Sequence, residues 1–242
     1  MEQHDDVVIV GAGVIGLASA LALIESGRRV RVIDARHVGG GSSQGNCATI
    51  KPSHAPPLAA PGTVLKALRW MLTPDAPLYI PPRFDPALWS WLLRFATRCN
   101  ERDWRVSAVA KSALLNDSRE RLADWVRGYG LACEFVESGE DYVYRDPRAF
   151  EHGQREIGLL RELGVSVEVV DGRRYEAREP ALKPGVAGAI CFDGDAALRP
   201  DRYVDELARV VRERGGTIVE QCALQGLDHE RNGVRLRTTQ GE

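Results

Sequence analysis

Three glycines and one aspartate near the start of the chain have the residue types and spacing of a site for phosphate and ribose. Gly11, Gly13 and Gly16 form a G-x-G-x-x-G pattern, and Asp34 follows Gly16 by 18 residues. The first glycine permits a tight turn, the second lets the backbone approach a diphosphate, and the third permits close packing of a helix on a sheet. A carboxylate at Asp34 can accept hydrogen bonds from both ribose hydroxyls and would repel a 2′-phosphate. The pattern therefore predicts a dinucleotide that contains ADP and disfavours NADP.

The glycines lie between a predicted strand and a predicted helix, which is the context that the motif requires. Residues 7–10 are the apolar run VVIV, and residues 30–33 (VRVI) form a second apolar run. Between them apolar residues such as Leu17 and Leu21 recur at helical spacing, and Gly27 is typical of a helix C-terminus. The N-terminus of such a helix offers unpaired N–H groups and about half a positive charge to a diphosphate. Together these elements predict a Rossmann-type βαβ unit.

A polar loop and one histidine follow the second strand. Residues 39–46 (GGGSSQGN) are typical either of a flexible linker or of a loop that places N–H groups and hydroxyls against a cofactor. Their position directly after Asp34 favours the second interpretation. His54 lies among prolines near this loop and is a weak candidate for a catalytic side chain that shapes the substrate pocket. A histidine packed in an irregular loop is an equally good explanation.

The next segment is rich in proline, which excludes long helices and regular central strands between residues 51 and 86. A short helix over residues 63–72 is the exception. Asp85 followed by Pro86 predicts the start of a helix over residues 86–98, whose aromatic side chains include Trp89 and Trp91. We favour packing of this apolar surface on the rest of the protein, with contact to a membrane or a partner as the alternative.

The remaining predicted elements alternate between helices and strands. They are helices over residues 106–129, 148–163 and 199–214, a strand pair of 134–136 with 142–144, and strands over 165–170, 187–192, 217–221 and 234–238. A βαβ unit, a long mixed insertion and a helix–strand return predict an α/β protein with a discontinuous nucleotide-binding domain. We assign residues 1–50 and 197–242 to that domain and residues 51–196 to an inserted α+β substrate, or cap, domain.

Composition and charge argue against several classes of protein. The 32 basic and 34 acidic residues give a net charge of −2, so no bulk field indicates nucleic acid binding. The five cysteines are scattered without metal-ligand spacing, and their odd number argues against a disulfide framework, so we expect no metal and a reducing compartment. Residues 1–6 lack the pattern of a signal peptide, and no run of about 18 apolar residues predicts a membrane span. These features predict a cytoplasmic protein.

Three segments together resemble FAD-dependent oxidoreductases of the D-amino-acid oxidase fold, and most closely the bacterial D-amino acid dehydrogenases. The first is the GAGVIG unit with Asp34, and the second is SQGN at residues 43–46, similar to the short polar segment that lines the flavin. The third is IKPSHAPPLAAPG at residues 50–62 followed by LKALRWM at 65–71, similar to the pattern P-x-x-A-x-P-x-A-A-P-G … L-K-A-x-x-W-M. A weaker match is EPAL at residues 179–182. The resemblance covers nearly the whole chain.

The resemblance implies an enzyme that deaminates D-amino acids oxidatively to 2-oxo acids with FAD as cofactor. A hydride would pass from Cα to flavin N5, and a quinone or another respiratory acceptor would take the electrons, which implies contact with the inner face of the plasma membrane. No catalytic base is required if the amine binds deprotonated. The residues that we expect to bind FAD are Gly11, Gly13, Val14, Ile15, Gly16, Asp34, Ala35, Arg36, Ser42, Ser43, Asn46 and Leu224, the last through its backbone.

The length of the chain departs from the family pattern, because family members are much longer than 242 residues. The expected parts after Gly241 include a glycine-rich flavin contact, a segment over the isoalloxazine ring, and the arginine and tyrosine that hold the substrate carboxylate. We therefore expect a truncated N-terminal fragment that binds FAD poorly and is inactive alone. Related alternatives are a D-hydroxyproline dehydrogenase and an amine oxidase of the sarcosine or glycine oxidase type. An alternative of another class is an inactive fragment or interaction subunit, and an NAD-dependent dehydrogenase is disfavoured.

Overall fold

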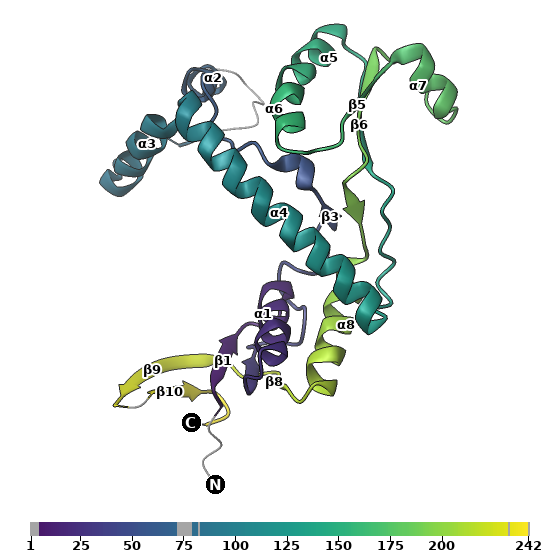
Figure 1. Cartoon of the computed structure of the whole chain (residues 1–242). Helices are drawn as coiled ribbons and strands as arrows, with labels where there is room; N and C mark the ends of the chain where they lie inside the picture. The colour runs from purple at the N-terminus through teal and green to yellow at the C-terminus, as the bar shows by residue number, and fades with distance from the viewer. Residues whose placement is uncertain (1–4, 72–78, 82, 232, 242) are drawn as a thin grey trace. The chain divides into compact units, whose positions relative to one another are not determined.

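The computed structural model describes residues 5–71, 79–81, 83–231 and 233–241, and the chain divides into two compact units (Figure 1). Unit 1 comprises Met1–Ile50, Leu122–Val136 and Ala196–Glu242, and unit 2 comprises Lys51–Arg121 and Glu137–Asp195. Residues 122–136, which the sequence-based division assigns to the insertion, pack with unit 1.

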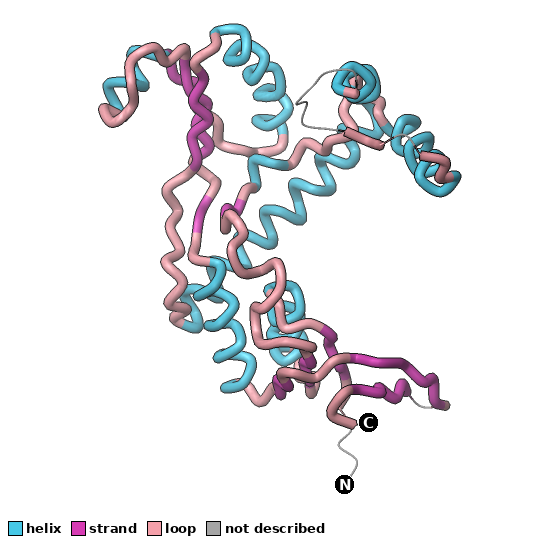
Figure 2. The backbone as a smooth tube through the Cα atoms, turned by 180° about the vertical axis from the view of Figure 1, so that it is seen from behind, coloured by secondary structure: helices cyan, strands magenta, loops and turns pink. Residues whose placement is uncertain are grey.

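Unit 1 is built around a parallel sheet in the order β1-β2-β8, in which Val8 lies opposite Arg31 and Arg31 opposite Thr217. Its elements are β1 (Val7–Val10), α1 (Val14–Glu25), β2 (Val30–Ile33), β3 (Thr49–Ile50), the end of α4 (Glu101–Tyr129), β7 (Ala196–Ala197), α8 (Pro200–Glu213), β8 (Thr217–Val219), β9 (Leu224–Glu230) and β10 (Gly233–Thr238). The predicted βαβ unit is therefore present. The last two strands form a separate antiparallel hairpin (Figure 2), of which only β10 was predicted.

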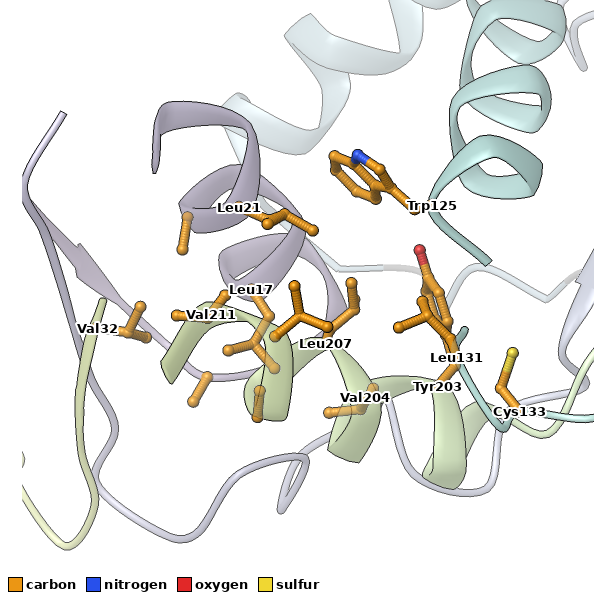
Figure 3. Close-up of a cluster of buried hydrophobic side chains, with 14 of the residues drawn as sticks. Leu17, Leu21, Val32, Trp125, Leu131, Cys133, Tyr203, Val204, Leu207 and Val211 are labelled. Atoms are coloured by element: carbon orange, nitrogen blue, oxygen red, sulfur yellow. The ribbon is translucent and has the colours of Figure 1, made fainter. Parts of the chain in front are cut away.

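The core of unit 1 lies between α1, α8 and the end of α4 (Figure 3). Leu17 and Leu21 of α1 and Leu207 of α8 are completely buried, and each contributes about 1.5–3 kcal/mol through the removal of apolar surface from water. Apolar residues recur at helical spacing along α8, which gives it one buried face. Trp125 joins this cluster, and its Nε1 donates a hydrogen bond to Glu25 Oε1 at 3.0 Å. These contacts hold residues 122–136 in unit 1.

Unit 2 combines helices with an antiparallel sheet in the order β4-β6-β5. Its elements are the 3₁₀ turn η1 (Pro52–His54), α2 (Thr63–Trp70), α3 (Pro86–Arg98), the start of α4, β4 (Glu140–Tyr144), α5 (Pro147–Gly153), η2 (Gln154–Glu156), α6 (Ile157–Glu162), β5 (Glu168–Asp171), α7 (Gly172–Arg178) and β6 (Gly188–Phe192). Every residue of the central strand β6 is buried. Unit 2 therefore has its own core, independent of α1 and α8.

The structure corrects two of the predicted elements. The strand pair of residues 134–136 with 142–144 is wrong, because β4 pairs with β6, and Val136 instead forms an isolated bridge with Ala197. The predicted helix over residues 148–163 is divided into α5, η2 and α6. The division falls after Gly153. A Cβ at this position would clash with the phenol of Tyr144, so the close approach of α5 to β4 requires glycine, and glycine has a low helix propensity.

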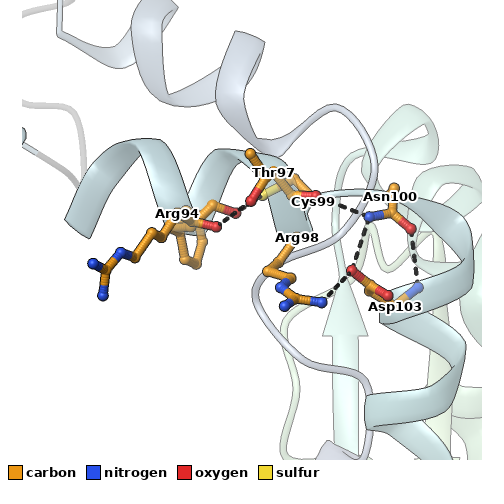
Figure 4. A network of polar contacts seen from close by, with 7 residues as sticks. Arg94, Thr97, Arg98, Cys99, Asn100 and Asp103 are labelled. Carbon is orange, nitrogen blue, oxygen red and sulfur yellow. Dashed lines mark hydrogen bonds and ion pairs between the residues drawn. The ribbon is translucent and has the colours of Figure 1, made fainter. Parts of the chain in front are cut away.

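The corner between α3 and α4 is fixed by local capping interactions (Figure 4). Asn100 Oδ1 accepts a hydrogen bond from the Asp103 N–H at 3.0 Å, while its Nδ2 donates to the Thr97 carbonyl at 3.0 Å. The Arg98 guanidinium pairs with Asp103 at 3.2 Å and so closes the corner. The predicted helix start at Asp85 is also present, since its Oδ1 accepts from the Leu88 N–H.

Helix α3 leaves its apolar side chains exposed. It buries none of its residues against the described part of the chain, and Trp89 and Trp91 are 52% and 59% exposed. The interpretation that we favoured, packing of this helix on the rest of the protein, is therefore wrong for the described residues. The predicted helix over residues 63–72 is present as α2, although Leu72 lies outside the described residues. No helix in the described ranges is long and apolar enough to cross a membrane.

Candidate functional site

The glycine-rich turn brings the end of β1 against the start of α1. Gly11 has a φ of +110°, which favours glycine, and its N–H donates to the Ile33 carbonyl at 2.7 Å. A Cβ on Gly16 would overlap the carbonyl oxygen of Gly11, and a Cβ on Gly13 would lie 2.9 Å from Ser43 Oγ. Gly11 therefore requires glycine for its backbone conformation and Gly16 for its close approach to the backbone, while a side chain at position 13 would displace the Ser43 hydroxyl.

The N-terminus of α1 is equipped to bind an anion. Its first turn contains no acidic side chain, so the positive end of the helix dipole is not neutralised. Within the described residues, the N–H groups of Gly13, Ile15 and Gly16 donate to no protein acceptor. The Val14 N–H donates to Ser43 Oγ at 3.0 Å, which leaves the hydroxyl proton of Ser43 for a further acceptor such as a phosphate oxygen.

Asp34 is held at the end of β2 by two backbone N–H groups. Its Oδ2 accepts from the Ala12 N–H and its Oδ1 from the Arg36 N–H, each at 2.7 Å. A carboxylate has about four acceptor positions, so each oxygen retains one for a ligand hydroxyl. The carboxylate is thus oriented beside the glycine-rich turn with acceptor capacity in reserve.

The polar loop after β2 folds back onto the glycine-rich turn. The Gly39 N–H donates to the Ala12 carbonyl at 3.0 Å. Asn46 Nδ2 donates to the Ser43 carbonyl at 3.0 Å, and its Oδ1 accepts from the Ala48 N–H at 2.7 Å. The loop is therefore an ordered part of the site, whereas Ser42, Ala35 and Arg36 expose their side chains.

The segment after β8 lies beside the residues that follow β2, including Asp34. The N–H groups of Gln221 and Cys222 donate to the carbonyls of Arg36 and Asp34 at 3.0 and 2.7 Å. Leu224 follows two residues later as the first residue of β9. Glu220 Oε1 accepts from the Val38 N–H at 2.7 Å, a contact across 182 positions for which no local sequence signal exists.

Unit 1 thus contains all of the residues that we predicted to bind the cofactor. The unpaired N–H groups of α1, the glycine positions without room for a Cβ and the oriented carboxylate fit the diphosphate and ribose of an ADP group. Among the described residues, no cluster of three or more His, Cys, Asp or Glu side chains is placed to hold a metal ion.

His54, the catalytic candidate, lies in unit 2 at the end of the 3₁₀ turn η1. Its side chain is exposed, and its Nε2 lies 2.8 Å from the Tyr142 hydroxyl of β4. The turn itself is anchored by buried Asp195, whose carboxylate accepts from the Ser53 N–H at 3.1 Å and from the Ser53 hydroxyl at 2.6 Å. The sequence indicated none of these partners, because Tyr142 and Asp195 lie far along the chain.

Lys51 directly precedes η1 and connects it to the same strand. Its Nζ donates to Glu140 Oε1 at 2.6 Å and to the Tyr142 hydroxyl at 3.2 Å. Burial, the largest single effect, lowers the pKa of Lys51, but the hydrogen bonds to Glu140 and Tyr142 together outweigh it and raise the pKa above 10.5. Lys51 is therefore a charged donor at neutral pH.

The fold and the nucleotide site define a Rossmann-type dinucleotide-binding protein with a second, α+β unit. Residues 6–242 match the family described as FAD dependent oxidoreductase (DAO), and the chain belongs to this family. The chain is 31% identical over 98% of its length to a D-amino acid dehydrogenase of Methylobacterium nodulans, and 33% identical over 91% to one of Cereibacter sphaeroides. It covers 57% and 52% of these two proteins, so the chain spans little more than half the length of the curated relatives it matches.

Solved structures of a glycine oxidase and of an L-proline dehydrogenase share the fold. Glycine oxidase from Bacillus cereus superposes with a TM-score of 0.65 at 18% identity, covering 98% of this chain and 52% of that one. L-Proline dehydrogenase from P. horikoshii superposes with a TM-score of 0.66 at 19% identity, covering 100% and 50%. FAD, rather than NAD, is therefore the cofactor of the family to which this chain belongs.

Proposed function

We propose that this chain is part of an FAD-dependent dehydrogenase that deaminates D-amino acids oxidatively to 2-oxo acids. The observation that carries the proposal is the similarity, over 98% of the chain, to proteins named D-amino acid dehydrogenase. The nucleotide site supports it, because its donors and carboxylate suit the ADP half of FAD. FAD, when bound, supplies the hydride acceptor for the hydrogen on the substrate Cα.

The residues of unit 1 would hold and orient the cofactor. The N–H groups at the start of α1 and the Ser43 hydroxyl bind the diphosphate, and the Asp34 carboxylate accepts from the ribose hydroxyls. The backbone at Leu224 meets the adenine. In unit 2, the exposed imidazole of His54 is available to the substrate, whose amine must bind in its neutral form before hydride transfer.

We further propose that a quinone or another respiratory acceptor takes the electrons at the cytoplasmic face of the plasma membrane. The exposed Trp89, Trp91 and Leu93 of α3 support this proposal, since aromatic side chains flanked by basic residues such as Arg94 and Arg98 suit an anionic membrane surface. Co-sedimentation with anionic and with neutral lipid vesicles tests it. Equal absence from both vesicle pellets would contradict it.

A substrate panel tests the proposed reaction. The whole protein of which we propose this chain to be part should show a flavin absorption spectrum when purified and should reduce a redox dye with D-alanine, while 2-oxo acid and ammonia form in equal amounts. L-Alanine, glycine, sarcosine and hydroxyproline isomers serve as comparisons for the amine oxidase alternatives. Dye reduction with glycine or sarcosine, but with no D-amino acid, would overturn the proposal. Absence of bound flavin from that whole protein would instead favour the interaction-subunit alternative.

A further inference from the structure

Four side chains of unit 2 form one continuous hydrogen-bonded chain that ends at the exposed imidazole of His54. Glu140 accepts from Lys51 at 2.6 Å, Lys51 donates to the Tyr142 hydroxyl at 3.2 Å, and that hydroxyl lies 2.8 Å from His54 Nε2. Lys51 and His54 belong to the segment after β3, whereas Glu140 and Tyr142 lie on the same face of β4. Two segments far apart in the sequence therefore meet to support one histidine.

The donors in this hydrogen-bonded series favour one position for the His54 proton. A lysine ammonium can only donate, so the Tyr142 oxygen accepts from Lys51 and has its own proton left to donate. Within the described residues, His54 Nε2 is the one acceptor that lies within hydrogen-bonding distance of this hydroxyl. When Nε2 accepts this proton it is itself unprotonated, and the neutral imidazole then carries its own proton on Nδ1.

The surrounding contacts fix the imidazole in place. The Tyr142 ring packs edge-on against Phe192, with ring centroids 5.5 Å apart, so the phenol has little freedom to turn. The backbone of η1 is clamped by the buried pair of Ser53 and Asp195, directly beside His54. An exposed imidazole held at its Nε2 and at its backbone presents the Nδ1–H in a defined position.

We propose that the Nδ1–H of His54 donates a hydrogen bond to the carboxylate of the amino-acid substrate, and that Tyr142, Lys51 and Glu140 are positioning residues that set its tautomer. This inference rests on the proposed function, since it concerns the substrate of that reaction. His54 would thus contribute a substrate contact from unit 2.

The chemistry of the hydrogen-bonded chain favours an anionic acceptor. Each donor in a connected series polarises the next, so the Lys51 ammonium strengthens the Tyr142 hydroxyl as a donor, and this hydroxyl strengthens the Nδ1–H of His54. The ammonium charge is balanced by Glu140, which leaves a neutral but polarised donor at the exposed end. A carboxylate oxygen is the strongest acceptor that an amino acid offers to such a group.

The tautomer gives the first test, independent of turnover. The ¹⁵N chemical shifts of His54, assigned among the five histidines by comparison with His54→Ala, should show a protonated Nδ1 and an unprotonated Nε2 in the flavin-loaded protein. Tyr142→Phe should abolish this preference, whereas the same substitution two residues along β4, Tyr144→Phe, should leave it unchanged. A protonated Nε2 in the unsubstituted protein would overturn the assignment.

Inhibition of the whole enzyme by propionate, which has a carboxylate but no amine, tests the contact itself. His54→Ala should raise the inhibition constant of propionate and the KM of D-alanine by about tenfold each, the loss of one hydrogen bond to a charged group. The kcat should change little, because the contact persists from ground state to transition state. Tyr142→Phe should act in the same direction and Tyr144→Phe should not.

The possible failures can be told apart. A raised KM with an unchanged propionate constant would show that His54 does not contact the carboxylate, and would overturn the inference while the proposed function stands. A flavoprotein that oxidises no D-amino acid would overturn the proposed function. In that case the ¹⁵N shifts of His54, measured with and without propionate, would still decide whether the imidazole binds a carboxylate.

Discussion

At the scale of single residues, the carboxylate of Asp34 is held in place by the backbone at both of its oxygens. Both of its oxygens accept from backbone N–H groups, those of Ala12 and Arg36. In Asp34→Asn the amide nitrogen must face one of these donors whichever way the side chain turns. We therefore expect FAD affinity to fall roughly 10- to 100-fold, in line with a lost hydrogen bond to a charged group. Titration of the whole apoprotein, rather than of this chain alone, with FAD, followed by flavin fluorescence, measures this change.

A matched control comes from a second aspartate, which accepts hydrogen bonds from the described residues through one oxygen. Asp171 caps α7, and its Oδ1 accepts from the Arg174 N–H at 3.1 Å. Asparagine caps a helix about as well as aspartate, so Asp171→Asn should leave both the fold and FAD affinity unchanged. If Asp34→Asn bound FAD as tightly as this control, the role assigned to Asp34 would be refuted.

At the scale of elements, the packing of α1 on β1 depends on the absence of a side chain at Gly16. A Cβ there would overlap the Gly11 carbonyl and lie 3.3 Å from Ile9 Cγ2, so Gly16→Ala must push the helix away from the strand. We expect a loss of about 1–3 kcal/mol in the free energy of unfolding, as for other overpacked sites, together with loss of bound flavin. Urea denaturation followed by circular dichroism, with the flavin content of the folded protein, measures both effects.

Gly128 provides the opposite case within the same unit. It lies on the exposed side of α4 with a helical backbone, and apart from the neighbouring backbone of its own helix no atom of the described residues lies within 4 Å of the position that a Cβ would occupy. Gly128→Ala should therefore stabilise the protein by about 0.5–1 kcal/mol through helix propensity alone. A Gly16→Ala protein as stable as the Gly128→Ala protein would show that the close approach at Gly16 has no structural role.

The elements that could be predicted from the sequence are those whose signals are local. The βαβ unit and the start of α3 at Asp85 were predictable because their signals are local: glycine spacing, helical periodicity and a capping aspartate. The partner of β4 could not be predicted in this way. Residues 134–136 are a possible strand close by in the sequence, whereas the actual partner, β6, lies more than forty positions away. The contact of His54 with Tyr142 joins residues 88 positions apart, so the sequence could nominate the histidine but not its support.

At the scale of the whole molecule, the two units differ in how their cores are built. In the described residues, unit 1 has one large cluster that includes Cys133, while the buried side chains of unit 2 fall into smaller separate clusters, one of which contains Cys191. The sequence predicted two domains but placed residues 122–136 in the insertion, because nothing local showed that Trp125 packs against α1. Because α4 is one continuous helix, its helical periodicity continues across the boundary between the units, and the boundary cannot be predicted from the pattern of apolar residues.

The divided core of unit 2 predicts that it opens before unit 1, and the buried thiols report on each unit separately. Burial raises the pKa of Cys191 to about 12 and also raises that of Cys133, so neither thiol reacts with iodoacetamide at pH 8 while its unit is folded. In increasing urea, mass spectrometry should detect alkylation of Cys191 at a lower urea concentration than alkylation of Cys133, because each smaller cluster buries less apolar surface.

Bound flavin should widen the difference between these two urea concentrations by stabilising unit 1. Exposed Cys47 should react throughout as the control. Coincident labelling of Cys133 and Cys191 would instead show that the two units unfold as one cooperative structure.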